Sequence, residues 1–297
     1  MTLDSLSFTV QMGLLYAIPA MAVLLAFRVV GFPDLTPDGS FTLGAGVSSI
    51  LLLQAWPELA ATCVAVGAGT LAGIVTALLH TRLRISKLLS GILVMTMLYS
   101  VSLRAMGTSN LSLRGVSTLL GSLSSRASGP LPIATITLIT GIVFLGLWTF
   151  LKTGVGLRLR AVGDSESVTE HRGLRREPFY ILGLGATNGL AALGGALVAQ
   201  YQGFVDVSMG TGLVIICLAA VIIGETIVRP DRVGLLMAAP VLGMIIYQGV
   251  IAVALRMNLA AADLKVATAA LALLFVAIDR LRVQKGAAGR QIGNRNI

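Results

Sequence analysis

Four acidic side chains border strongly apolar segments, where a charged group is costly to keep. Asp34 and Asp38 precede one apolar run. Asp206 precedes another, and Glu225 ends it. Ionisable groups at membrane depth are rare and usually mark substrate or ion routes. These four residues are therefore candidates for lining a translocation pathway.

Each acid also has a simpler interpretation. Asp34 and Asp38 suit a turn, because the intervening sequence is rich in Pro and Thr and is followed by Gly. Asp206 suits the N-cap of a helix. Glu225 lies four residues before Arg229, and this spacing suits an i,i+4 ion pair. A role of Glu225 in an inner gate is an equal alternative.

Uncharged side chains extend the candidate pathway. Met95, Tyr99 and Ser102 share one face of a helix by their spacing. The remaining members are hydroxyl residues near the acids and one amide, namely Thr36, Ser40, Ser208 and Asn188. Polar groups in apolar helices also hydrogen-bond across helix interfaces, so pathway lining and helix packing both stay open for them.

A polar, charged segment separates two apolar runs at residues 152–177. Asp164 and Ser165 can cap a short helix that begins after them. Glu166 would lie near the positive end of that helix, and Gly173 suits a left-handed C-cap. We therefore expect a short polar helix between two spans, although an ordinary solvated loop would have the same composition.

Membrane-spanning helices must position these residues. Apolar residues make up 56% of the 297 and charged residues 12%, with a mean hydropathy of +0.89. Soluble domains carry roughly 25% charged residues, so a soluble globular fold is excluded. The fold class is all-α, a polytopic membrane protein with about nine spans, eight to ten, each of bilayer-crossing length. The apolar runs cover 8–30, 40–56, 59–80, 87–106, 131–151, 178–200, 208–228, 233–255 and 263–281.

The basic residues predict the orientation. The first span has no basic segment before it, so we expect it to be retained rather than cleaved as a signal. With the N-terminus outside and the C-terminus inside, all but five of the 22 Lys and Arg residues fall in inside loops or ends. The exceptions are Arg104, Arg114, Arg126, Arg256 and Lys265. The net charge of +9 is therefore explained by membrane loops, and no nucleic-acid partner is expected.

A faint internal repeat links two parts of the chain. Residues 32–36 precede the short second span, and residues 204–208 precede the seventh span, which small residues interrupt. The predicted orientation places the two copies at opposite faces, which suggests an inverted repeat of the kind found in transporters. Five matched positions support chance similarity equally well.

The polar segment carries a family resemblance. Its pattern Gly-x-x-Leu-Arg-Ala-x-Gly-Asp-x-Glu, which starts at Gly156, resembles the cytoplasmic coupling segment of ABC importer permeases, closest to the branched-chain amino acid and ribose permease superfamily. Residues 31–41, 88–96, 98–107 and 206–212 resemble one subgroup, which is paired with a tryptophan/tyrosine-type lipoprotein binding component.

The resemblance implies a single permease domain over residues 1–283, with the coupling segment at 152–177 and a basic, mobile tail at 284–297. The protein is expected to lie in the bacterial inner membrane, where lipid surrounds it. The coupling residues that carry over are Gly156, Leu157, Arg158, Arg160, Ala161, Gly163, Asp164, Glu166 and Gly173. The expected partners are cytoplasmic ATPase subunits, an extracytoplasmic binding lipoprotein and a second permease copy in a homodimer.

The chain itself is not expected to be an enzyme. It contains no Gly-x-x-x-x-Gly-Lys-Ser/Thr phosphate loop, so ATP and Mg²⁺ would be used by the partner and no cofactor would bind here. With two His and two Cys, no metal site is expected. The function is then that of a permease subunit that moves a small solute, with an amino acid suggested, by alternating access. An ion-gradient-driven secondary transporter is the alternative, although its usual mid-membrane charges are scarce here.

Overall fold

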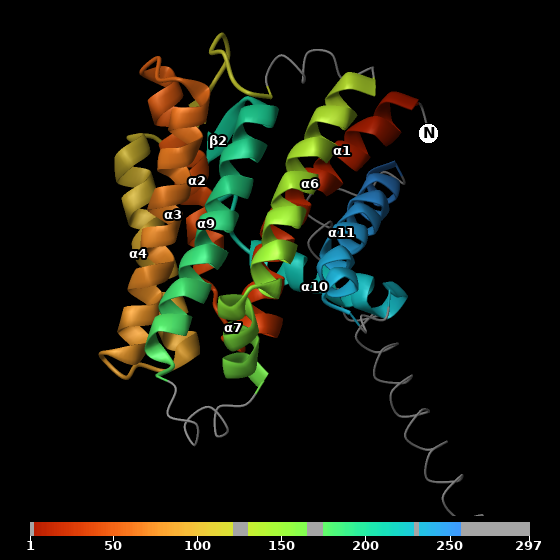
Figure 1. Cartoon of the computed structure of the whole chain (residues 1–297). Coiled ribbons are helices and arrows are strands. Elements are labelled where there is room, and N and C mark those ends of the chain that lie inside the picture. Colours follow the sequence, from red (N-terminus) through yellow and green to blue (C-terminus); the bar gives the residue numbers. More distant parts are fainter. Residues whose placement is uncertain (1–2, 121–129, 165–174, 229–231, 257–297) are drawn as a thin grey trace, which may run out of the picture.

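Helices account for almost all of the structure. The computed structural model describes residues 3–120, 130–164, 175–228 and 232–256, which form a helical bundle with one small two-stranded ribbon (Figure 1). The helices are α1 (Leu3–Leu24), η1 (Leu25–Val30), α2 (Thr36–Leu53), α3 (Glu58–Thr81), α4 (Lys87–Met106), α6 (Pro130–Lys152), α7 (Gly154–Asp164), α9 (Glu177–Gln202), α10 (Leu213–Val228) and α11 (Val233–Arg256). The strands β1 (Asn110–Ser112) and β2 (Phe204–Asp206) pair antiparallel.

The predicted fold class is confirmed. Within the described part, 6 helices are long and apolar enough to cross a membrane. α2 and α10 are the two shortest of the helices that match predicted spans, as their weak sequence patterns indicated. α10 starts at Leu213 rather than at residue 208, because β2 and a turn occupy residues 204–212. The predicted span at 263–281 and the tail at 284–297 lie outside the described residues.

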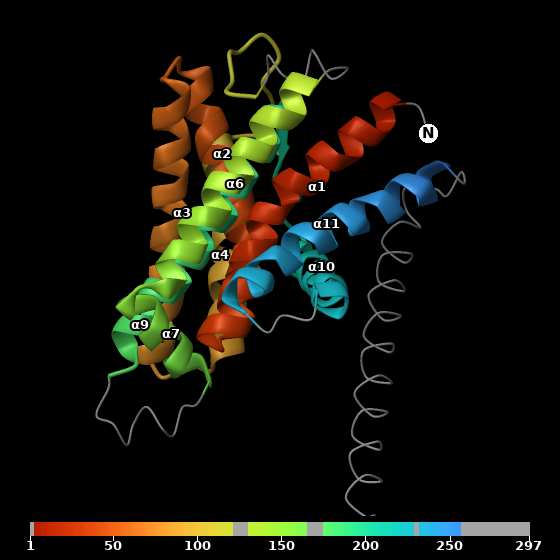
Figure 2. The same ribbon diagram turned by 45° about the vertical axis from the view of Figure 1, so that its right-hand side comes forward.

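α1 and α11 lie side by side in one part of the bundle (Figure 2), and in the other part α9 packs against α3 and α2. Glycine permits this close approach. A Cβ at Gly73 of α3 would lie 2.1 Å from the Leu184 carbonyl oxygen, and one at Gly195 would lie 1.9 Å from that of Phe41. Backbones this close are typical of helix packing in lipid, where small residues let the helices approach and van der Waals packing drives their association.

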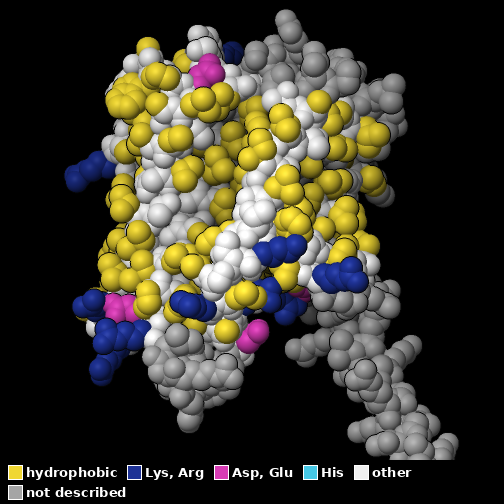
Figure 3. Space-filling model, viewed as in Figure 1, with side chains coloured by type: hydrophobic (Ala, Val, Ile, Leu, Met, Phe, Trp, Pro, Cys, Tyr) yellow, Lys and Arg dark blue, Asp and Glu magenta, His cyan; other side chains and the backbone are white. Residues whose placement is uncertain are grey.

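Apolar side chains cover the sides of the bundle, and basic side chains gather at one end (Figure 3). Leu59, Leu71 and Leu138 are each more than 60% exposed on outward faces, which suits contact with lipid. The α3–α4 connection and the α6–α7 region supply Arg82, Arg84 and Arg158. We call this the basic end of the bundle.

Candidate functional site

A buried polar cluster forms around Asp34. Its Oδ1 accepts a hydrogen bond from the Thr36 backbone N–H at 2.9 Å, and its Oδ2 accepts one from Asn188 Nδ2 at 2.9 Å. Ser40 Oγ donates to Asn188 Oδ1 at 2.7 Å. All four residues are fully buried. They join α2 to α9, so in this conformation their contacts are those of helix packing rather than of an open pathway.

Asp38 has a different role, because it caps a helix that is far away in the sequence. Its Oδ1 accepts from the Val214 N–H at 2.7 Å, and its Oδ2 accepts from the Gly212 N–H at 2.9 Å. These donors are the free N–H groups at the start of α10, where negative charge is favourable. The predicted turn over residues 36–39 is wrong, since α2 already begins at Thr36.

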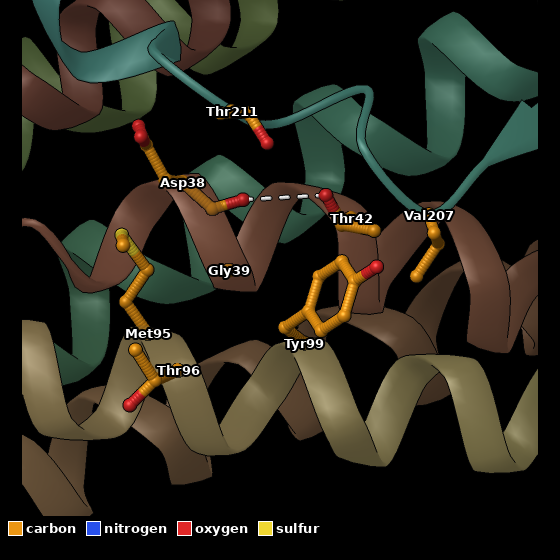
Figure 4. A pocket seen from close by; sticks show the side chains of 8 residues that line it. All are labelled: Asp38, Gly39, Thr42, Met95, Thr96, Tyr99, Val207 and Thr211. Atoms are coloured by element: carbon orange, nitrogen blue, oxygen red, sulfur yellow. Dashed lines mark hydrogen bonds between the residues drawn. The ribbon is translucent and has the colours of Figure 1, made fainter.

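A pocket of about 200 Å³ lies beside this cap, between α2, α4 and the turn that precedes α10 (Figure 4). The side chains that line it are Asp38, Thr42, Met95, Thr96, Tyr99, Val207 and Thr211, together with Gly39. Three of them were predicted as pathway residues: Asp38, Met95 and Tyr99. Thr42 was missed, although its i+4 spacing from Asp38 could have indicated it.

The other candidates near the pocket do not line it. Ser102 is 1% exposed, and its Oγ has no hydrogen-bond partner among the described residues. Asp206 Oδ1 accepts from the Ser208 N–H at 2.8 Å, and α10 begins seven residues later at Leu213. The predicted N-cap role of Asp206 is therefore wrong, since Asp38 supplies that cap. Asp34 and Asp206 do form the same local turn with the residue two positions on, at corresponding places of the predicted repeat.

Glu225 pairs with Arg28. Arg28 Nε donates to Glu225 Oε1 at 3.0 Å, and a second bond joins Nη2 to Oε2. This bidentate pair ties α10 to η1, a π-helical segment of the kind often found at functional sites. Arg229, the partner that the spacing suggested, lies outside the described residues.

The coupling segment begins with a helix that the sequence did not predict. α7 runs over Gly154–Asp164, so Asp164 is its last residue. The polar helix expected after residue 164, with Glu166 and Gly173, lies outside the described residues. α7 follows α6 with a break at Thr153 and packs against η1. It lies at the lower end of the bundle in Figure 1, which is the basic end.

α7 has an inward and an outward face. A Cβ at Gly163 would lie 2.1 Å from the Val29 carbonyl oxygen, and one at Gly31 would lie 2.8 Å from the Gly163 carbonyl oxygen. Gly31 also has a φ of 65°, which favours glycine. α7 therefore touches the end of η1 backbone to backbone. Among the predicted coupling residues, Gly156 is buried and Arg160 is half-buried, whereas Leu157, Arg158, Ala161 and Asp164 are exposed. Gly154 and Val155, at the start of α7, are exposed as well.

An aromatic cluster lies directly after the Gly31 contact. The rings of Phe32, His80 and Tyr180 meet edge to face at centroid distances of 5.2 to 5.6 Å. Lys87 Nζ lies over the Phe32 and Tyr180 rings and donates to the Gly31 carbonyl oxygen at 3.1 Å. The loop between η1 and α2 is thereby held by α3, α4 and α9.

Comparisons with known proteins agree with this arrangement. A family model described as "Branched-chain amino acid transport system / permease component" matches residues 5–278. A tyrosine transport system permease protein of Clostridioides difficile is 38% identical over 274 residues, 91% of this chain and 90% of the relative. The ribose import permease protein of Escherichia coli is 26% identical over 250 residues, 82% of this chain and 77% of the relative. An uncharacterized protein of Rickettsia prowazekii is 34% identical over 207 residues, 70% of this chain and 72% of the relative. No solved structure matches the chain.

The chain belongs to the branched-chain amino acid transport permease family, and it is a permease subunit of an ABC importer. The predicted resemblance is confirmed. The comparisons give no support to the alternative of a gradient-driven secondary transporter.

Proposed function

We propose that this permease carries an amino acid with an aromatic side chain, delivered by an extracytoplasmic binding lipoprotein, past the pocket between α2 and α4. Two features support the substrate class. One is the likeness to a permease of a tyrosine transport system over nine-tenths of both chains. The other is the pocket lining, in which Met95 and Tyr99 offer surfaces for a ring while Thr42, Thr96 and Thr211 offer hydroxyl groups.

The same proposal makes α7 the helix that receives force from a cytoplasmic ATPase. The observation that carries it is the two-faced geometry of α7. Gly163 locks its inward face onto η1, whereas Leu157, Arg158, Ala161 and Asp164 leave the outward face exposed for a partner. Leu157 is 51% exposed at a charged end of the bundle, where an apolar side chain suits protein contact better than water.

Orientation and assembly complete the proposal. Basic loops favour the cytoplasm, so the basic end faces inward, the N-terminus lies outside and the C-terminus lies inside, in a bacterial inner membrane. The ATPase holds ATP and Mg²⁺. Two copies of this chain form the pore, since Met97, Tyr99 and Val101 leave α4 exposed beside a partly open pocket that a second copy would close.

Co-purification and uptake test the proposal together. The chain is expressed with candidate ATPase and binding-protein subunits from the same genome, purified in mild detergent and placed in vesicles for uptake of labelled tyrosine. Leu157→Glu should remove the ATPase from the purified complex. Leu83→Glu is the matched control, because Leu83 is 65% exposed at the same end but not on α7. Retention of the ATPase by the Leu157 variant contradicts the docking face. Uptake of ribose but not tyrosine contradicts the substrate class.

A further inference from the structure

A second hollow lies on the side of the bundle, well away from the pathway pocket. It has a volume of about 610 Å³ and is lined by α3, α6 and α9. It exists because α9 packs on α3 and α2, whereas α6 packs on α1, α7 and α11. A gap is left between α6 and α9, which face the viewer in Figure 1. We call this hollow the lateral groove.

The lining of the lateral groove is apolar. Val66, Leu147, Phe150 and Leu190 are typical of it, and none of the described residues that line it is charged. Its one polar side chain is Thr70, whose hydroxyl already donates to the Val66 carbonyl oxygen at 2.9 Å. A polar solute would lose its hydration there without gaining a hydrogen bond. The occupant must therefore be hydrocarbon.

The length of the groove matches one leaflet of the bilayer. On α9 the lining runs from Ile181 to Leu193, about 18 Å at 1.5 Å per residue. The hydrocarbon core is about 30 Å thick, and a membrane-spanning helix would need all of it. The groove begins near the basic end, since Ile181 lies in the second turn of α9 and Phe150 in the last turn of α6. This length suits an acyl chain better than a further helix.

Positive charge lies where the headgroup of such a lipid would be. Arg82 follows Ile74 by two turns along α3, and Arg175 precedes α9. Both are exposed. Arg82 uses Nε for a 2.6 Å contact with Glu177 Oε1, and its side chain is 72% exposed. Figure 3 shows Lys and Arg side chains along this end of the same face. Basic residues near a membrane surface attract anionic lipid headgroups.

We propose that the lateral groove binds one anionic phospholipid, with an acyl chain between α6 and α9 and a phosphate headgroup beside Arg82 and Arg175. The lipid would fill the space that the helices leave open and would lie against α6, which leads directly into α7. The site does not depend on the transport direction or on the transported solute, because it is defined by the groove and the charges alone.

Native mass spectrometry tests the proposal on the full chain together with its co-purifying subunits. After lipid removal by a long detergent wash, phosphatidylglycerol or phosphatidylcholine is titrated in. Gly146→Leu fills the groove without a clash, because a Cβ at Gly146 meets nothing within 4 Å. Gly141→Leu is the matched control: it lies on the same helix and is equally open, but it does not line the groove.

We expect each copy of the chain, in wild type and in Gly141→Leu, to bind one phosphatidylglycerol. Gly146→Leu should bind it about ten-fold more weakly, which corresponds to losing the burial of about two methylene groups. Arg175→Gln should reduce the preference for phosphatidylglycerol over phosphatidylcholine. Equal binding by the two leucine variants, or equal binding of the two lipids by wild type, overturns the proposal. So does a photo-crosslinker at position 146 that labels residues 263–281 instead of lipid in native membranes. None of these results bears on tyrosine uptake, so the proposed function is tested independently by the uptake experiment.

Discussion

Replacing Gly163 by alanine is the sharpest test of how α7 acts. The added Cβ would lie 2.1 Å from the Val29 carbonyl oxygen, whereas real Cβ contacts are essentially never under 3.0 Å. Both partners are backbone, so neither can rotate out of the way. α7 and η1 must separate by about 0.9 Å, and overpacking of this kind typically costs about 1–3 kcal/mol.

That cost falls on the contact between α7 and η1 rather than on α7 itself. Alanine is better than glycine inside a helix by about 1 kcal/mol, so the helix should still form. A penalty of about 1–3 kcal/mol lowers the population of the docked state by about 5- to 150-fold relative to the undocked state. The ATPase should still bind, because the exposed face of α7 is unchanged.

The assay measures solute uptake and ATP hydrolysis in the same vesicles. We expect Gly163→Ala to co-purify with the ATPase and to hydrolyse ATP, while uptake per ATP falls by at least about five-fold. Gly154→Ala, on the same helix with nothing within 4 Å of its Cβ, should behave as wild type. Equal coupling in the two variants would refute the idea that α7 acts through backbone contact with η1. Loss of the ATPase from Gly163→Ala would refute the separation of the two faces.

Three further outcomes follow from the site. Asn188→Ala should lower the thermal unfolding temperature in detergent, because the buried Asp34 carboxylate and Ser40 hydroxyl each lose a hydrogen-bond partner. Leaving a buried polar group unpaired costs about 1–3 kcal/mol of stability. An unchanged unfolding temperature would contradict the buried cluster. If the Arg28–Glu225 pair closes an inner gate, Arg28→Gln should raise ATP hydrolysis in the absence of solute. The increase should be at most about five-fold, since an exposed ion pair contributes at most about 1 kcal/mol. Exchanging the two residues with each other should restore the low rate of hydrolysis. Tyr99→Ala should reduce tyrosine uptake by about two- to ten-fold, as loss of one aromatic contact does. Leu103→Ala, exposed on the same helix but outside the pocket, should not.

Hydropathy predicted the spans well because lipid imposes one simple requirement on them. The predicted 87–106 coincides with α4, and 59–80 is within one residue of α3 at either end. Each is an apolar run whose limits are set by polar or helix-breaking residues. Inside the bilayer, every backbone N–H and C=O group must find its hydrogen-bond partner within the protein, and a helix provides these partners. No long-range information is needed for such a helix.

The sequence did not predict α7 because its stabilising contacts are with residues far away in the chain. Its sequence alternates glycine, leucine and arginine, and glycine weakens a helix that stands alone. Its stabilising contact is the approach of Gly163 to Val29, more than a hundred residues earlier in the chain. The cap of α10 by Asp38 and the pair between Arg28 and Glu225 were missed for the same reason, since each joins residues more than 170 positions apart.

The segment from Leu25 to Thr42 connects the two parts of the proposed mechanism. Its first part is η1, which touches α7 at Gly31 and pairs with α10 through Arg28. Seven residues after Gly31, Asp38 caps α10 and lines the pocket. Between them Asp34 is fixed to α9 through Asn188.

A displacement of α7 can therefore reach the pocket through a short and mostly buried stretch of chain. Gly31 is the one position in that stretch with a positive φ, and its backbone is free of a side chain at the point of contact. The Gly31 carbonyl oxygen accepts a hydrogen bond from Lys87, and the Phe32 ring packs against the Tyr180 ring, so Gly31 and the residue after it are held to α4 and α9. Spatial continuity alone does not establish coupling; a two-state element does. The proposed mechanism needs such an element, and η1 is where it would lie, because rewinding its π-helical turn to α-helix would rotate the residues beyond it.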